Sequence, residues 1–124
     1  MAVVLIADDD PDIRDLVEFR LTQVGHAVVA REDGQAALEA IRANRPDIAL
    51  LDVMMPGMTG IEVCRALRTE RATADLPVIL LTARASDSDM EEGIEVGADD
   101  YVIKPFSLRD LTNRVEELLA EGRT

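Results

Sequence analysis

Several residue types that mark particular protein classes are scarce in this 124-residue chain. A single cysteine, Cys64, can form neither an intramolecular disulfide nor a cysteine-based zinc site. No apolar run approaches the ~18 residues of a membrane span, and no basic and apolar signal segment opens the sequence. Basic residues are also few, 13 against 25 acidic ones, and the net charge of −12 disfavours binding to nucleic acid or to an anionic membrane. We therefore expect a cytoplasmic protein with other kinds of partner.

What the chain does contain is a regular alternation of short apolar runs with amphipathic stretches. Hydrophobic residues make up 48% of the sequence, enough for one globular domain over residues 1–124. The runs are continuous and rich in β-branched residues, which is typical of strands buried on both faces of a parallel sheet. The predicted strands are Val3–Ala7, Ala27–Ala30, Ile48–Leu51, Val78–Leu81 and Tyr101–Ile103.

Apolar residues at helical spacing fill the intervals between these runs. Asp10 followed by Pro11 predicts the N-cap and first residue of a helix, and Gly60 precedes a third helix. Five β-α units predict a doubly wound α/β sandwich around a five-stranded parallel sheet, although the pattern itself leaves the strand order open. The apolar residues assigned to the first, second, third and last helices are Ile13, Leu16, Val17, Leu21 and Val24; Ala37, Leu38 and Ile41; Cys64 and Leu67; and Leu108, Leu111, Val115 and Leu118.

The fourth interval, from about Asp87 to Val96, gives the weakest of the predicted helices. It carries few large apolar residues and has Gly93 inside it. Ser86 and Ser107 precede the fourth and fifth helices, each with an aspartate three residues further on, as in a variant of the capping box. A helix that buries little apolar surface is easy to displace, so we expect the fourth helix to be the one that moves.

Reactive side chains occur where four of the predicted strands end. The carboxyl ends of parallel strands share one edge of the sheet, which is where open α/β folds bind their ligands. We therefore expect these side chains to converge on one spot. They are Asp8 and Asp9 after the first strand, Asp52 at the end of the third, Thr82 at the end of the fourth and Lys104 after the fifth.

The chemistry of this set points to phosphoryl transfer. Two or three carboxylates within ~4–5 Å repel one another by a few kcal/mol, and an all-oxygen set of ligands suits Mg²⁺. Such a metal would neutralise an incoming phosphate and leave Asp52 free to attack it. Lys104 would supply a positive charge for the phosphoryl oxygens, and Thr82 would supply a hydroxyl donor.

Single residues of this kind have ordinary structural explanations. Asp10 is better explained as a helix cap than as a metal ligand, because Pro11 follows it directly. His26, the one histidine, precedes the second strand and is expected far from these strand ends, in a structural or exposed position. Cys64 lies on the apolar face of a helix and is expected in the core. The convergence of four strand ends, rather than any one residue, therefore supports the functional prediction.

Four segments of the sequence together resemble the receiver domains of two-component response regulators, the CheY-like superfamily. The resemblance covers essentially the whole chain and is closest to receivers that carry a winged-helix DNA-binding domain. It implies a flavodoxin-like fold with strand order 2-1-3-4-5, and a phosphorylation-dependent signalling switch rather than an enzyme. Whether the chain is a stand-alone receiver or one domain of a longer regulator stays open. The four segments are Val4–Asp10, Leu51–Gly60, Leu81–Ala83 and Gly97–Phe106.

The resemblance also implies a role for each residue of the acidic site. Asp52 matches the phosphoacceptor, Asp9 a direct Mg²⁺ ligand and Asp8 an acid that usually acts through water. The backbone carbonyl of Met54 matches a further metal ligand. Lys104 matches the lysine that binds the phosphoryl group.

Switching is implied in the same way. Thr82 matches the hydroxyl that turns toward the phosphoryl group, and Tyr101 matches the aromatic residue that then turns inward. Met54 and Arg84 match positions that tune the lifetime of the phosphorylated form.

The partners implied are a histidine kinase or phosphotransfer protein, docking near the first helix and the loop after Lys104. Phosphorylation is implied to change the face made by the fourth helix, the fifth strand and the fifth helix, and to promote a homodimer through it. Asp100 and Arg114 resemble a charge pair at that interface.

Two functions of other classes fit the sequence less well. A phosphatase of the haloacid dehalogenase type would need a second acid two residues after its nucleophile, where this chain has Met54. A flavin-binding electron carrier of the same fold would need hydroxyls and amides in its first loop, where Asp8, Asp9 and Asp10 would repel a phosphate. A glycine-rich phosphate loop of either common type is also missing.

Overall fold

The predicted strands form one parallel sheet in the computed structural model, which describes residues 2–83 and 96–121. The strand order is β2-β1-β3-β4-β5, so the order implied by the resemblance is confirmed. Every neighbouring pair in the sheet is parallel. The strands are β1 Val3–Ala7, β2 Ala27–Arg31, β3 Ile48–Asp52, β4 Val78–Thr82 and β5 Asp100–Ile103.

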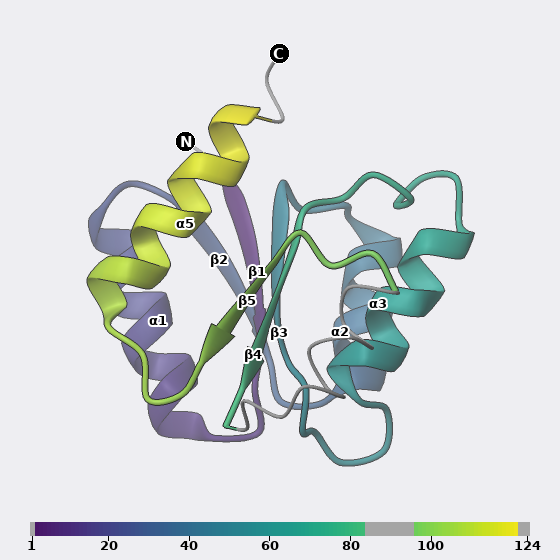
Figure 1. Cartoon of the computed structure of the whole chain (residues 1–124), viewed down its shortest axis with the longest axis horizontal. Helices are drawn as coiled ribbons and strands as arrows, with labels where there is room; N and C mark the ends of the chain where they lie inside the picture. The colour runs from purple at the N-terminus through teal and green to yellow at the C-terminus, as the bar shows by residue number, and fades with distance from the viewer. Residues whose placement is uncertain (1, 84–95, 122–124) are drawn as a thin grey trace.

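Helices cover both faces of this sheet, α1 and α5 on one side and α2 and α3 on the other (Figure 1). The doubly wound α/β sandwich is therefore confirmed. Ser86, Arg84 and all but the last residue of the predicted fourth helix lie outside the described residues. No helix in the described part of the chain is both long enough and apolar enough to cross a membrane. The described helices are α1 Pro11–Gln23, α2 Gly34–Ala43, α3 Gly60–Thr69 and α5 Leu108–Glu121.

The core consists of two buried clusters, one on each face of the sheet. Successive strand residues point to opposite faces, so Leu50 packs under α1 and α5 whereas Leu51 packs under α2 and α3. Every residue of β3 and β4 is buried, which explains why these strands are continuously apolar up to their last residues, Asp52 and Thr82. Each fully buried Leu or Ile side chain contributes about 1.5–3 kcal/mol. The core therefore holds the carboxyl ends of the central strands in fixed positions.

The second strand departs from the prediction that every strand is covered on both faces. β2 is an edge strand paired with β1, and its residues are exposed at both ends and only half-buried between them. An edge strand has one neighbour instead of two, so its side chains meet fewer partners. The charged side chain of Arg31 at its end is typical of an edge that must not pair with another chain.

Helix starts follow the capping signals in the sequence. The Asp10 side chain accepts a hydrogen bond from the Asp12 backbone N–H (2.9 Å), and Pro11 opens α1. Ser107 lies immediately before α5, and its hydroxyl oxygen accepts a hydrogen bond from the backbone N–H of Asp110 in the first turn of the helix (3.2 Å). Both predicted starts are confirmed, and Asp10 is engaged as a cap.

Some apolar residues of the helices do not lie where the periodicity predicts. In α1, Leu16 is 55% exposed, and Val24, which follows the helix as its C-cap, is 40% exposed. In α5, Leu119 is the buried residue near the C-terminal end, whereas Leu118 and Leu108 are half-buried. The apolar stripe of a helix spans about 100° or more of its circumference. Residues at the margin of the stripe can therefore remain exposed while those at its centre pack against the sheet.

Candidate functional site

Three aspartates meet at the carboxyl edge of the sheet. Asp52, the last residue of β3, is 3% exposed, and Asp8, directly after β1, is fully buried. Asp9 follows it and is exposed. One carboxylate oxygen from each of the three lies within 4.8 Å of the others. The structure thus brings together the acids that the sequence pattern placed at these strand ends.

Lys104 reaches into this cluster from the loop after β5. Its Nζ lies 2.7 Å from Oδ2 of Asp8 and 3.4 Å from Oδ2 of Asp52. The Lys104 backbone N–H donates to the carbonyl oxygen of Thr82 (2.6 Å), which fixes the start of the loop beside the end of β4. The ammonium group therefore faces two buried carboxyl groups at once.

Burial and mutual repulsion govern protonation in this cluster. Burial, followed by the charge of Asp8, raises the pKa of Asp52 to about 7, although Lys104 and the backbone N–H of Met54 act in the opposite direction. Burial lowers the pKa of Lys104, but the hydrogen bond to Asp8 and the charges of both aspartates outweigh it, so this pKa is raised. Among the described residues, the ammonium group of Lys104 does not fully offset the burial of Asp52 and its repulsion by Asp8, so the site favours an added proton or cation.

The donor set fits a small divalent cation such as Mg²⁺. Oxygen atoms are its preferred ligands in proteins, and one or two carboxylates usually hold it. Asp8, Asp9 and Asp52 could each offer one oxygen, since these atoms lie within 4.8 Å of one another. The backbone N–H of Met54 lies 3.3 Å from Oδ1 of Asp52, so the chain after β3 also borders the acids. A second positive charge there would offset the effects that raise the pKa of Asp52.

Hydrogen bonds hold the turn that carries Asp8 and Asp9. The Asp10 backbone N–H donates to Oδ1 of Asp8 (2.9 Å), and Nη1 of Arg14 donates to the Asp8 carbonyl oxygen (2.7 Å). Sequence reasoning did not identify Arg14. A long cationic side chain on the second turn of a helix that follows an acidic loop is the signal that could have found it, because it can reach back to the loop.

Thr82 and Tyr101 lie on neighbouring strands beside the cluster. Thr82 ends β4 and is buried, and Tyr101 on β5 is half-buried opposite Leu80. Thr82 and Leu80 are two residues apart and therefore point to the same face of the sheet. Tyr101 packs against the core cluster on that face, which contains Leu80. Both predicted switch residues thus border one side of the sheet near the phosphoacceptor candidate.

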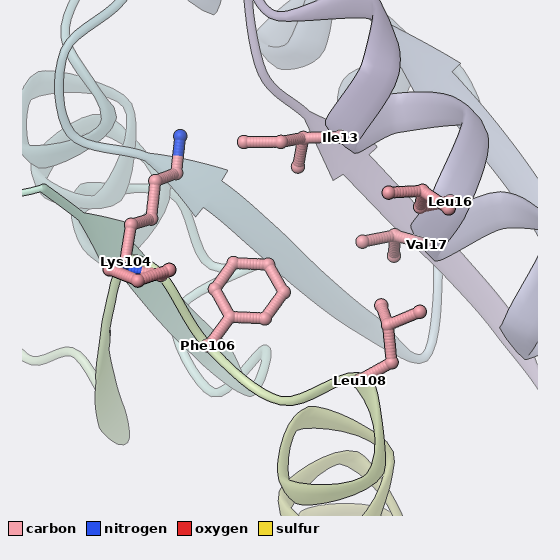
Figure 2. Close-up of a pocket in the computed structure, with 7 residues that line it drawn as sticks. Ile13, Leu16, Val17, Lys104, Phe106 and Leu108 are labelled. Atoms are coloured by element: carbon pink, nitrogen blue, oxygen red, sulfur yellow. The ribbon is translucent and has the colours of Figure 1, made fainter.

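An apolar pocket of about 150 Å³ adjoins the cluster on the side of α1. Figure 2 shows side chains of α1 facing Phe106 across it, with the stem of Lys104 at its border. Leu16, one of the apolar residues at helical spacing in α1, lines this pocket and is 55% exposed, because the loop 104–108 does not cover it. The lining residues are Ile13, Leu16, Val17, Lys104, Pro105, Phe106 and Leu108.

Other residues singled out from the sequence lie away from the acids. Asp100 and Arg114 contact each other within the chain, Oδ1 to Nη1 at 2.6 Å, and so join β5 to α5. His26 is buried at the opposite, amino edge of the sheet, where its Nε2 faces Glu116 of α5. Cys64 is buried in the core, where burial raises the pKa of its thiol.

Residues 4–116 match the family described as Response regulator receiver domain. The chain belongs to this family. Receivers of this family act as phosphorylation switches in two-component systems, so the recognition made from the sequence motifs is confirmed. The family indicated is one of signalling proteins rather than of enzymes.

Named relatives agree with this assignment. The receiver is 50% identical to the transcriptional regulatory protein CseB of Streptomyces avermitilis over 116 residues, which are 94% of this chain and 48% of CseB. It thus spans about half the length of the curated relatives it matches.

Solved structures show the same fold. Chemotaxis protein CheY4 of Vibrio cholerae superposes with a TM-score of 0.90 at 35% identity, over 95% of this chain and 98% of that one. The BeF3-activated N-terminal receiver domain of RstA from Klebsiella pneumoniae gives a TM-score of 0.86 at 33% identity, over 94% and 97% of the two chains.

Proposed function

We propose that this receiver, a single domain over residues 1–124, accepts a phosphoryl group on Asp52 when Mg²⁺ is bound. The observation that supports this most is the convergence of buried Asp52 and Asp8 with Lys104, whose Nζ lies 3.4 Å and 2.7 Å from them. Phosphoryl transfer needs mainly positioning and charge neutralisation, and this geometry offers both.

In the transfer step, a carboxylate oxygen of Asp52 bonds to phosphorus while phosphorus loses its bond to the leaving group. From a phosphohistidine of a histidine kinase or phosphotransfer protein, the leaving group is the imidazole nitrogen. From acetyl phosphate, the leaving group is acetate. Asp52 must be ionised to attack, and Lys104 provides a cation for the phosphoryl oxygens. Later attack by water on phosphorus releases inorganic phosphate and restores Asp52.

Bound Mg²⁺ supplies the charge that favours ionised Asp52 and shields the incoming phosphoryl oxygens. We assign Asp9, Asp52 and the Met54 backbone carbonyl as direct ligands. Both carboxylate oxygens of Asp8 already accept hydrogen bonds, from the Asp10 backbone N–H and from Lys104, so Asp8 is assigned a contact through water. Met54 itself is 58% exposed and apolar, which makes it a poor orienter of attacking water. Together with Arg84, it is proposed to set a phosphorylated lifetime of minutes or longer.

The output of the switch is proposed to be a change in the face of the fourth helix, β5 and α5. The hydroxyl of Thr82 would turn toward the phosphoryl group, and Tyr101 would take the space it leaves. Asp100 and Arg114 lie on this face, and Ile103 beside them is 42% exposed. This apolar and charged surface suits a homodimer or another protein partner that forms after phosphorylation.

The phosphodonor is proposed to dock on α1 and the loop 104–108. Leu16, which lines the apolar pocket beside Lys104, is 55% exposed, and Phe19, three residues further along α1, is 68% exposed. Leu16→Ala should slow transfer from a phosphorylated histidine kinase by about tenfold, since a truncated anchor residue at an interface costs about 1–2 kcal/mol. Labelling by acetyl phosphate, which needs no docking surface, should stay within twofold. Equal loss with both donors would contradict the docking assignment.

Intact mass after incubation with acetyl phosphate tests the function directly. The mass should rise by one phosphoryl group with Mg²⁺ and remain unchanged with excess chelator. Asp52→Ala should abolish the label, whereas Asp75→Asn, which alters an exposed aspartate of the loop before β4, should keep it. Labelling of Asp52→Ala, or labelling of the wild type in chelator, would refute the proposal.

A further inference from the structure

The first residue of α2 lies against the loop that follows Asp52. A β-carbon placed on Gly34 would lie 2.1 Å from the carbonyl oxygen of Met58 and 2.9 Å from the Met58 β-carbon. Non-bonded atoms do not approach so closely, so any other residue would push on the main chain of the loop 53–59. The backbone of Gly34 has no positive φ, which means that space alone requires glycine here.

The loop 53–59 is short and is held at both ends beside the phosphoacceptor candidate. A β-carbon on Gly60 would lie 2.4 Å from the Asp52 carbonyl oxygen, and the Gly60 N–H donates to Val53 (3.2 Å). At the other end, the Met54 N–H lies 3.3 Å from Oδ1 of Asp52. A displacement at Met58 must therefore be absorbed within a few residues, among which is the peptide that contacts the carboxylate.

The helix is better anchored than the loop. The Asp33 side chain accepts from the Ala36 N–H (2.7 Å) at the start of α2, and buried Leu38 and Ile41 fix the helix in the core. The loop buries Val53 and Met55 at its start, but it exposes Met54 and has no regular secondary structure to resist a shift at Met58. When the two are pushed apart, the loop is the part that yields.

We infer that Gly34 is a positioning residue for the phosphoacceptor site. Its missing side chain sets the distance between α2 and the loop 53–59, and the loop in turn sets where the Met54 peptide lies beside Asp52. This inference rests on the proposed function and deepens it. It assigns a part in the site to a residue that has no polar side chain and lies outside the acidic cluster.

A second glycine provides a matched control. Gly25, in the turn between α1 and β2 at the amino edge, has φ +100° and nothing within 4 Å of an added β-carbon. Gly25→Ala therefore strains the backbone without touching the loop, whereas Gly34→Ala touches the loop without straining φ. The two substitutions add the same methyl group, but one disturbs only the backbone conformation and the other only the packing.

The test compares wild type, Gly34→Ala and Gly25→Ala in the whole chain. Mg²⁺ affinity is measured from amide chemical shifts, labelling from intact mass with acetyl phosphate at saturating Mg²⁺, and folding from the melting curve. Gly34→Ala should melt cooperatively but label at least about tenfold more slowly and bind Mg²⁺ several-fold more weakly, because small misplacements at a reacting centre have large effects on rate. Gly25→Ala should melt earlier, with Mg²⁺ affinity and labelling within twofold of wild type.

Mg²⁺ affinity and labelling of Gly34→Ala within twofold of wild type would overturn the inference, and so would equal losses in Gly25→Ala. If Gly34→Ala does not fold, Met58→Gly removes the loop β-carbon that faces Gly34 and gives the loop backbone more freedom to shift, so it should weaken Mg²⁺ binding. Unchanged binding in that variant would again overturn it. A wild type that neither binds Mg²⁺ nor takes the label would instead remove the proposed function itself.

Discussion

At the amino edge of the sheet, the side chains of His26 and Asp47 each have a complementary hydrogen-bonding partner, whereas at the carboxyl edge several aspartates are crowded together. Nδ1 of His26 accepts from the Ala2 backbone N–H (3.2 Å), and its Nε2 faces Glu116. Asp47 accepts from the Val3 backbone N–H (2.7 Å) near the start of β1. These contacts join the first and second strands to α5 and to the turn before β3.

The carboxyl edge is arranged differently. Asp8 and Asp52 are buried there side by side, with one lysine between them and a pKa for Asp52 of about 7. Burying like charges lowers stability unless a cation or a proton is added. One sheet thus contains a stabilising edge and a reactive edge, which are separated by the length of five-residue strands.

Removing Lys104 should have the largest effect on stability. Lys104→Met keeps most of the apolar stem but leaves Asp8, fully buried, without the ammonium group 2.7 Å away. Removing one partner of a buried ion pair costs about 3–5 kcal/mol. We expect a loss of this size in urea unfolding at pH 8 in chelator. Since Lys104 lowers the pKa of Asp52, its loss should raise that pKa further and make the defect smaller at pH 5.

Arg109→Met is the matched control for this variant. Arg109 is an exposed cation on the first turn of α5, so its loss should change the free energy of unfolding by less than about 0.5 kcal/mol. Equal effects of the two substitutions would mean that the carboxyl edge is not short of positive charge.

Asp52→Asn should act in the opposite direction. The pKa of Asp52 is about 7 in the folded protein against an ordinary 3.8, so between these pH values the folded state holds a proton that the unfolded state has released. Stability therefore falls as the pH rises from about 4 to about 7. At 1.36 kcal/mol per pKa unit, the amide should add roughly 2–4 kcal/mol at pH 8 in chelator. Urea unfolding at pH 5 and pH 8 measures this, and an unchanged pH slope in the variant would argue against it.

The sequence could predict this edge because topology decides it. Parallel strands end together, so Asp8, Asp52, Thr82 and Lys104 had to meet once the five apolar runs were recognised as strands. The strand order needed more than periodicity, since covering both faces of a sheet does not specify which strands are neighbours. That order came from resemblance to a family.

The remaining details depend on side-chain reach and on contacts between distant segments. The predicted role of Lys104, a positive charge for the phosphoryl oxygens, does not specify the contact of its Nζ with Asp8 that the structure contains. Arg14 was missed because its contact depends on how far its side chain reaches back to the loop, and Gly34 was missed because it has no side chain. Leu16 has the same helical spacing as the buried apolar residues of α1. Its exposure depends on where the loop 104–108 stops, which no local pattern encodes.

Adding Mg²⁺ should raise the free energy of unfolding through contacts at the reactive, carboxyl edge and leave the contacts at the amino edge unchanged. At a hundredfold excess over its dissociation constant, a ligand that binds only the folded state adds about 2.7 kcal/mol. The melting temperature in Mg²⁺ should therefore exceed that in potassium chloride of equal ionic strength. Asp9→Asn should reduce this gain and slightly raise metal-free stability, because one like charge is gone. A wild-type melting temperature that does not change when Mg²⁺ is added would contradict the assignment of the aspartates as Mg²⁺ ligands.

His26→Ala should show that the amino edge serves stability alone. The substitution removes the buried acceptor for Ala2 and the contact with Glu116, which together should cost about 1–2 kcal/mol. Labelling of the variant by acetyl phosphate, measured at a temperature where it is folded, should stay within twofold of wild type. Slower labelling in a fully folded variant would mean that the two edges are coupled.

The smallest effect is expected on the flank of the sheet, where Arg114 and Asp100 form an ion pair whose side chains are 43% and 28% exposed. Pairs this accessible contribute about 0–1 kcal/mol, so Arg114→Ala should barely change monomer unfolding. In the proposed dimer, each residue would exchange its partner within the chain for the same residue of a second copy. The number of pairs would not change, which means that the pair would fix the register while apolar surface near Ile103 supplies affinity.

Sedimentation with Mg²⁺ and beryllofluoride, a mimic of the phosphoryl group, separates these contributions. Arg114→Ala should weaken the activated dimer by less than about tenfold, the equivalent of 1.4 kcal/mol, and Ile103→Ser should weaken it more. The charge-reversed double variant Asp100→Arg with Arg114→Asp should dimerise like the wild type, because it restores complementary pairs. A monomeric wild type at ~100 μM would rule out a dimer with a dissociation constant in the micromolar range. A larger loss with Arg114→Ala than with Ile103→Ser would show that charge, as at the carboxyl edge, dominates this surface too.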